Sequence, residues 1–306
     1  MNVATLVERV RSEVLDDEIE PYLWTDTNLI NYLNDTIDEL AEDNLVMTDQ
    51  STASVAEIKL LSNQILHPID DRVLQVRYGR LETNKTDVIK TTEDWLNGNI
   101  ADWRNTDGSA PTYFCPSVSK GYLSIYPKYD ATYEYLGVAN ISFVGGATKS
   151  ITQLTGDFSG LVAGDEIYIS GTTDNNGFFT VVTAGTTSFT VSESVTTEAS
   201  TSATIRKVMD TLLMTVNRIS MTPFTVSDIA DSTDITELKS VHHSKLLNGI
   251  AKKAFLKPDS DTYDKGKAEY HRGLFEVDKK RMKRDIILLN KPDRSRTIRS
   301  GTGIGY

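Results

Sequence analysis

Residues 240–285 read SVHHSKLLNGIAKKAFLKPDSDTYDKGKAEYHRGLFEVDKKRMKRD. Apolar residues in the first half recur with a period of about 3.6, which predicts one stripe on an amphipathic α-helix. That stripe comprises Val241, Leu246, Leu247, Ile250, Ala251, Ala254 and Phe255. Pro258 ends the helix, because proline lacks an amide hydrogen and restricts the residue before it.

A second helix is predicted from about Asp261, its expected N-cap, to Asp285. Its predicted stripe comprises Tyr263, the stem of Lys267, Tyr270, Leu274, Val277 and Met282. Together the two segments predict a helical hairpin. We interpret this hairpin as a peripheral clamp and not as a catalytic centre.

The N-terminal region predicts two more helices. The first covers about residues 3–14, and the second begins at Thr25 or Asp26 and continues to Ala41. One face of the second helix is acidic and comprises Asp35, Asp38, Glu39, Glu42 and Asp43. Such a face is ordinarily a solvated surface; the alternative is a wall facing a negatively charged partner that must not adhere.

Between these helical ends the chain has the pattern of strands. Residues 73–78, 122–127 and 209–218 are rich in β-branched and aromatic side chains, and Pro127 closes the second of these runs. Residues 137–208 differ in composition, because Thr, Ser, Gly and Val dominate. Their short alternating runs, separated by Gly, Asn and Asp turns, predict a small all-β domain of immunoglobulin-like or barrel form.

The predicted fold class is therefore α+β. Helices at both ends flank an antiparallel β core, into which a small all-β domain is inserted. The predicted boundaries are residues 1–136 and 209–287 for the discontinuous core, residues 137–208 for the insert, and residues 288–306 for an extended C-terminal arm. The arm contains too little apolar surface to form a core of its own.

Charge is unevenly distributed along the 306 residues, whose formal net charge is −11. Residues 1–50 contain 13 acidic and 2 basic residues, whereas residues 279–306 contain 9 basic and 2 acidic residues. The two ends are therefore expected to face different partners. The acidic majority argues against general nucleic-acid binding, which requires Lys and Arg to neutralise phosphates.

No apolar run approaches the roughly 18 residues of a membrane span. The first 14 residues contain acids where a signal peptide has its apolar core. We therefore expect a protein that is made and works on the cytoplasmic side, or one that is delivered without secretion. Cys115 is the single cysteine, which excludes an internal disulfide.

The sequence contains no convergent set of catalytic residues. Phosphate-binding loops, dinucleotide fingerprints and nucleophile elbows are absent. His242 and His243 point to different faces of a helix, so they do not chelate one metal from the same side. The 174–177 turn lacks the closing glutamate of a calcium loop. We expect no enzymatic activity, no metal and no cofactor.

The order of parts resembles the head-to-tail adaptor (connector or neck) proteins of tailed double-stranded DNA bacteriophages, including their tail-tubular relatives. The resemblance covers about residues 1–136 and 209–306, and the insert departs from it. The residues that carry it are Leu33, Leu40, Trp103, Pro111, Tyr113, Leu123, Ser124, Ile125, Tyr126, Pro127, the LLMTVNR run at 212–218, Ile235, His242, Leu246, Leu247, Ala251 and Ala254.

This resemblance implies a virion protein at the head–tail junction, assembled in the host cytoplasm. It implies a ring of identical subunits, usually a dodecamer, that docks under the portal protein and extends the DNA channel to a downstream tail or nozzle protein for genome ejection. The C-terminal segment would grip the portal, with Lys291, Arg294, Arg296, Ile298, Arg299, Ile304 and Tyr306 as contacts.

The charge pattern fits this implication. An acidic helix face lining a channel would repel DNA, so the genome would pass without specific binding. Three rival interpretations stay open: a receptor-binding or decoration protein that uses the β insert, a virion-associated glycan hydrolase, and a regulatory helical binding module.

Overall fold

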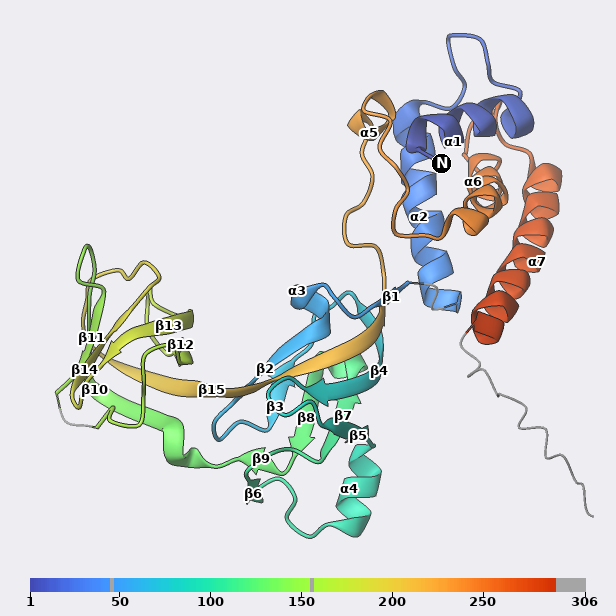
Figure 1. Cartoon of the computed structure of the whole chain (residues 1–306). Coiled ribbons are helices and arrows are strands. Elements are labelled where there is room, and N and C mark those ends of the chain that lie inside the picture. The colour runs from blue at the N-terminus through green and yellow to red at the C-terminus, as the bar shows by residue number, and fades with distance from the viewer. Residues whose placement is uncertain (45–46, 155–156, 290–306) are drawn as a thin grey trace, which may run out of the picture. The chain divides into compact units, whose positions relative to one another are not determined.

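The computed structural model describes residues 1–44, 47–154 and 157–289 (Figure 1). The chain divides into two compact units. Met1–Met47 and Ile219–Tyr306 form a helical unit, and Thr48–Arg218 forms a β unit. The helical unit thus unites the two ends of the chain, and the β unit is one continuous segment between them.

The N-terminal helices follow the predicted periodicity. Helix α1 (Val3–Val10) begins where the Asn2 side chain accepts a hydrogen bond from the Thr5 amide at 2.8 Å. A π-helical turn, η1 (Arg11–Leu15), continues it, and α2 (Asp26–Asn44) follows. The apolar faces of both helices are buried, as predicted: Val3, Leu6, Val7, Val10, Leu29, Ile30, Leu33, Ile37, Leu40 and Ala41.

Chain segments after the β unit pack on these helices. They comprise α5 (Ser227–Ala230), η4 (Ser240–Lys245), α6 (Leu246–Ala254) and α7 (Lys265–Leu289). The predicted α6 stripe is buried except for Val241. Gly249 lies at the closest point of the packing, because a Cβ there would come within 2.2 Å of Thr36 Cγ2 and 2.9 Å of the Phe275 ring. The helical hairpin is therefore part of the unit's core.

The predicted inward stripe of α7 is wrong. Tyr263, Tyr270, Leu274 and Val277 are 54%, 64%, 37% and 44% exposed. The buried residues are Ala268, Phe275, Lys279 and Met282, of which only Met282 was predicted. Both apolar rows have helical spacing, so periodicity alone does not decide which row faces α6. The helix also begins at Lys265, four residues after the predicted cap, where the Asp264 carboxylate accepts the Lys267 amide at 2.9 Å.

The β unit is built on one large, mostly antiparallel sheet. Its strand order is β10-β11-β14-β13-β12-β15-β4-β5-β7-β8-β3, with β1 and β2 also paired to β15. The bounds are β1 (Thr48–Asp49), β2 (Glu57–Leu61), β3 (Leu66–Pro68), β4 (Val73–Leu81), β5 (Asp87–Lys90), β7 (Tyr113–Ser117), β8 (Tyr122–Tyr126), β10 (Glu134–Val144), β11 (Ser150–Gln153), β12 (Glu166–Ser170), β13 (Gly177–Ala184), β14 (Ser188–Val191) and β15 (Glu198–Arg218).

Short elements complete this unit. A separate parallel pair joins β6 (Asp107–Gly108) to β9 (Lys128–Tyr129), and β5 pairs with β7 in parallel. The helical turns are α3 (Ala53–Ala56), α4 (Glu93–Asn99), η2 (Val118–Lys120) and η3 (Ala131–Tyr133). The Thr92 side chain caps α4 by accepting the Trp95 amide.

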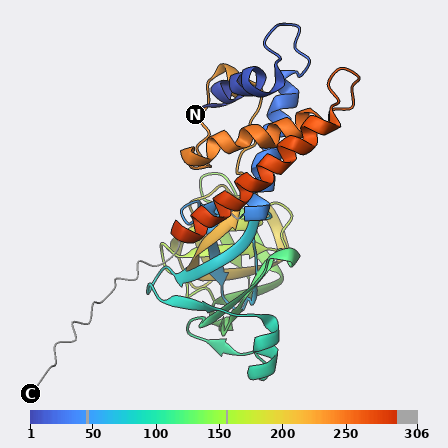
Figure 2. The same cartoon turned by 90° about the vertical axis from the view of Figure 1, so that its right-hand side faces the viewer.

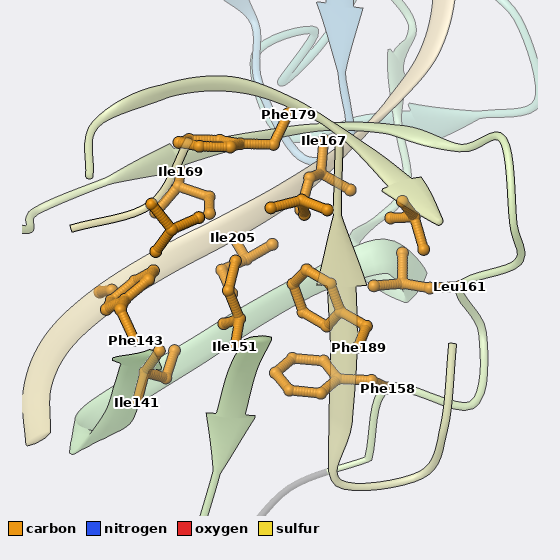
Figure 3. Packing of buried hydrophobic residues seen from close by; sticks show 14 residues of the cluster. Ile141, Phe143, Ile151, Phe158, Leu161, Ile167, Ile169, Phe179, Phe189 and Ile205 are labelled. Atoms are coloured by element: carbon orange, nitrogen blue, oxygen red, sulfur yellow. The ribbon is translucent and has the colours of Figure 1, made fainter. Parts of the chain in front are cut away.

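Strand β15 joins the predicted insert to the rest of the sheet. Its first part pairs with β10 and β12, and its second part pairs with β2 and β4. The predicted β runs of residues 137–208 are strands, and they enclose a core of Ile141, Phe143, Ile151, Phe158, Leu161, Ile167, Ile169, Phe179, Val181, Phe189, Val191, Val195, Ala203 and Ile205 (Figure 3).

The structure shows no separate immunoglobulin-like or barrel domain in the described part of these residues. The physical reason is that β15 is a single 21-residue strand shared by both parts of the sheet. The predicted boundaries at 136/137 and 208/209 fall inside β10 and β15. The α+β class itself is confirmed: N-terminal helices, a large mostly antiparallel sheet and C-terminal helices.

Candidate functional surfaces

Three carboxylates of the predicted acidic face lie against lysines of α6 and α7. Glu39 accepts hydrogen bonds from Lys252 at 2.6 Å and from Lys279 at 3.3 Å. Asp43 pairs with Lys279 at 2.8 Å, and Asp35 pairs with Lys253 at 3.7 Å. This face therefore contributes ion pairs that join α2 to the C-terminal hairpin.

Burial and pairing act in opposite directions on these groups. Burial would raise the pKa of Glu39, but hydrogen bonds from Lys252 and Lys279 outweigh it and hold that pKa below its usual value. Burial would lower the pKa of Lys279, but its hydrogen bonds to three carboxylates raise that pKa above its usual value. Both groups therefore stay charged in the folded protein at neutral pH.

The remaining acids of the face have different surroundings. Burial raises the pKa of Asp38, and its Oδ1 has no hydrogen-bond partner among the described residues. Glu42 is exposed and has no ion pair in the described part of the chain. Asp35 and Asp43 remain 61% and 50% exposed at the side chain. Whether these acids line a DNA channel stays a prediction.

The connection between α1 and α2 is organised around a buried arginine that the sequence analysis did not single out. Arg11 pairs with Asp17 and with Asp26, each at 2.8 Å, and its guanidinium lies 3.8 Å from the Tyr22 ring centroid. Asp17 also accepts the Leu23 and Trp24 amides. An arginine six residues before an aspartate is a weak signal in sequence, which explains why it was missed.

An acidic hollow of about 610 Å³ opens beside this connection. Its carboxylates are Glu8, Glu18, Glu20 and Asp26. Its other lining residues are Ala4, Val7, Arg11, Ser12, Tyr22 and Ile229, so it is bordered by α1, by the connection and by α5. Among the described residues, only Asp26 of these four acids has an ion pair.

The outward face of α7 is the second surface that the sequence analysis missed. We define it by Tyr270, Gly273, Leu274, Val277, Arg281 and Arg284. It points away from the buried row of Ala268, Phe275 and Met282, and in Figure 2 α7 lies in front of α2 and α6. The face combines exposed apolar side chains with two arginines that are 64% and 72% exposed.

Reactive groups in the described residues do not converge. No group of three or more His, Cys, Asp or Glu side chains there is arranged to hold a metal ion. His242 and His243 are both buried, and burial raises the pKa of the Cys115 thiol. The described helices include none long and apolar enough to cross a membrane.

Comparison with known families identifies the chain. The sequence model of the SU10 adaptor protein family matches residues 1–301. The chain belongs to the SU10 adaptor protein family. This match includes segments of both compact units. A search of curated proteins finds no match.

This membership confirms the predicted resemblance to phage head-to-tail adaptors. The adaptor is a structural, non-enzymatic protein of the phage virion. The predicted portal-binding residues of this adaptor, from Lys291 to Tyr306, lie outside the described residues. The backbone of α7 extends to Leu289, so the helix includes the first two residues assigned to the arm.

Proposed function

We propose that this adaptor assembles into a ring, expected to be a dodecamer, that docks under the portal protein and continues the DNA channel to a downstream tail or nozzle protein. The observation that carries this proposal is the family match over residues 1–301. The location would be the head–tail junction of the virion, after assembly in the host cytoplasm, and the ring would conduct the genome during ejection.

The proposed portal contact is the basic C-terminal arm. Four of its seven proposed contact residues are basic: Lys291, Arg294, Arg296 and Arg299. Ile298, Ile304 and Tyr306 supply apolar anchors. A basic segment that orders on an acidic groove of the portal would make docking depend on the finished portal ring.

Mixing the purified adaptor with portal rings tests the function directly. Electron microscopy of the mixture should show an added ring on one end of the portal. Deleting residues 291–306, which leaves α7 intact, should abolish that ring while the protein still unfolds cooperatively. A deletion variant that docks as well as the full chain would contradict the assignment of the arm.

We propose that the strands of residues 137–208 form an inserted β domain that shares β10 and β15 with the rest of the sheet. Exposed apolar side chains there favour a second candidate function, that of a receptor-binding or decoration surface. Leu154, Val162, Phe178 and Val182 are all exposed. Glycan-array binding by the full-length adaptor, lost on replacement of Phe178 and Val182 by Ser, would support that alternative.

A further inference from the structure

The outward face of α7 is an exposed apolar helix face with no partner among the described residues. Tyr270, Leu274 and Val277 are three and four residues apart, so they form one row, which Arg281 and Arg284 continue toward the C-terminus. Among the described residues the arginines make only long ion pairs, each 3.9 Å from an aspartate of the same helix. Such exposed pairs contribute little to stability, so both charges are available to a partner.

Gly273 lies in the middle of this face. A glycine in a helix interior is less favourable than an alanine. No described residue lies within 4 Å of where its Cβ would be, so no contact in the described part of the chain explains the glycine. A missing side chain allows another backbone to approach closely. The glycine therefore indicates a partner that packs against the helix.

The acidic hollow complements the outward face of α7 in charge and in apolar surface. Glu8, Glu18 and Glu20 have no ion pair among the described residues, and the half-buried Ile229 supplies apolar contact area. Arg11 holds the connection in place through its ion pairs with Asp17 and Asp26. Because that connection is already ordered, docking into the hollow would lose little conformational entropy.

The positions of the two surfaces suit a ring. A ring of identical copies needs a head-to-tail contact between two different surfaces of the same chain. Helices α5 and α7 lie on opposite sides of α2 in the helical unit (Figure 1). The hollow borders α5 through Ile229. Surfaces on opposite sides allow each copy to contact two neighbours.

From these observations we propose that the outward face of α7 docks onto the acidic hollow of a second copy of the chain. Arg281 and Arg284 meet the carboxylates of the hollow, and Tyr270, Leu274 and Val277 cover its apolar lining. This inference rests on the proposed ring and specifies the contact that would close it.

Charge reversal with complementation tests the contact. Arg281→Glu with Arg284→Glu should weaken assembly on portal rings on the order of tenfold or more. Glu18→Lys with Glu20→Lys should do the same. A mixture of the two variants should assemble, because each altered face then meets its altered complement. Lys283→Glu is the matched control, since Lys283 is also exposed on α7 but lies off the helical row of Tyr270, Leu274 and Val277.

Gly273→Ala distinguishes an effect on the contact from an effect on helix stability. This substitution should raise the thermal midpoint of the free protein, because alanine favours helix, and yet reduce assembly. Unchanged assembly of all three variants, or a mixture of the charge variants that does not assemble, overturns the proposed contact. If wild-type protein fails to join portal rings, that failure counts against the ring function instead.

A disulfide test needs no portal. Val277→Cys protein mixed with Ser12→Cys protein should form a disulfide-linked dimer at high protein concentration, whereas Lys283→Cys with Ser12→Cys should not. Ser12 lines the hollow, and the native Cys115 is buried. Absence of the specific dimer in free protein and on portal rings alike overturns the inference.

Discussion

Lys279 is the residue on which the ion pairs of the helical unit converge. Its ammonium group lies 2.8 Å from Asp43, 2.5 Å from Glu276 and 3.3 Å from Glu39. The side chain is 10% exposed, so its stem packs in the interior while its charge reaches the carboxylates. From the sequence, Glu39 and Asp43 were expected on a solvated surface or on a wall facing a negatively charged partner, because a pattern of acids does not show which lysines oppose it.

Replacing Lys279 with Met should therefore lower the free energy of unfolding by about 1–3 kcal/mol, because partly buried carboxylates lose their counter-charge. Partial exposure of Asp43 and Glu276 keeps the loss below that of a fully buried pair. Urea titration measures the change. Lys280→Met on the exposed side of α7 is the control, and an equal loss in both variants would contradict the explanation.

His67 gives the β unit a dependence on pH. The imidazole is 1% exposed, and burial lowers its pKa from 6.5 to about 4. Between those two values the unfolded chain binds a proton that the folded chain does not. The contribution of neutral His67 to the free energy of unfolding is therefore fully present above pH 6.5. It is lost as the pH drops toward 4, which lowers the free energy of unfolding by about 3 kcal/mol in total.

Urea unfolding at pH 7 and at pH 4.5 tests this expectation. His67→Gln should lose less stability on acidification than wild-type protein. Burial also lowers the pKa of His242 and of His271, but both proteins contain these residues, so their contributions cancel in the comparison. Equal acid sensitivity of the two proteins would show that His67 is not the group responsible.

At the scale of elements, two helical glycines predict opposite effects of the same substitution. Gly249→Ala should destabilise the protein by about 1–3 kcal/mol, because its methyl group would collide with Thr36 and Phe275. Gly273→Ala should stabilise it by about 1 kcal/mol, because its surroundings are open. Thermal denaturation of both variants measures the contrast. Shifts of the same sign would contradict the packing of α6 against α2 and α7.

The sequence predicted elements better than it predicted what each element contacts. Helical and strand periods located α1, α2, α6 and several strands of the β unit, since burial on one face leaves a local pattern. The inward side of α7 was not predictable, because Tyr270 and Phe275 belong to two rows of equal spacing. The extent of β15 was also not predictable, since its continuity depends on pairing with strands more than 50 residues away, such as Leu212 with Leu81.

At the scale of the whole molecule, the distribution of charge bears on how DNA would pass the adaptor. Glu39, Asp43 and Asp35 are paired with lysines, so Glu42 carries more of any repulsion that this face exerts. A ring repeats each side chain once per copy, which multiplies the effect of one substitution. In the proposed ring, this face can be tested through Glu42, because its exposed side chain can be replaced without disrupting the packing of α2.

Glu42→Lys should convert rings that release DNA into rings that retain it. In portal-bound rings, the affinity for a short DNA duplex at low salt should rise about tenfold or more, and the rise should disappear as salt increases, because added lysines bind phosphate by releasing counterions. Fluorescence anisotropy of labelled duplex measures it. Asp94→Lys is the matched control, since Asp94 is exposed on α4 and its replacement changes the charge equally. If both variants bind DNA equally, the assignment of the α2 face to the channel is wrong, because the gain then follows total charge and not position.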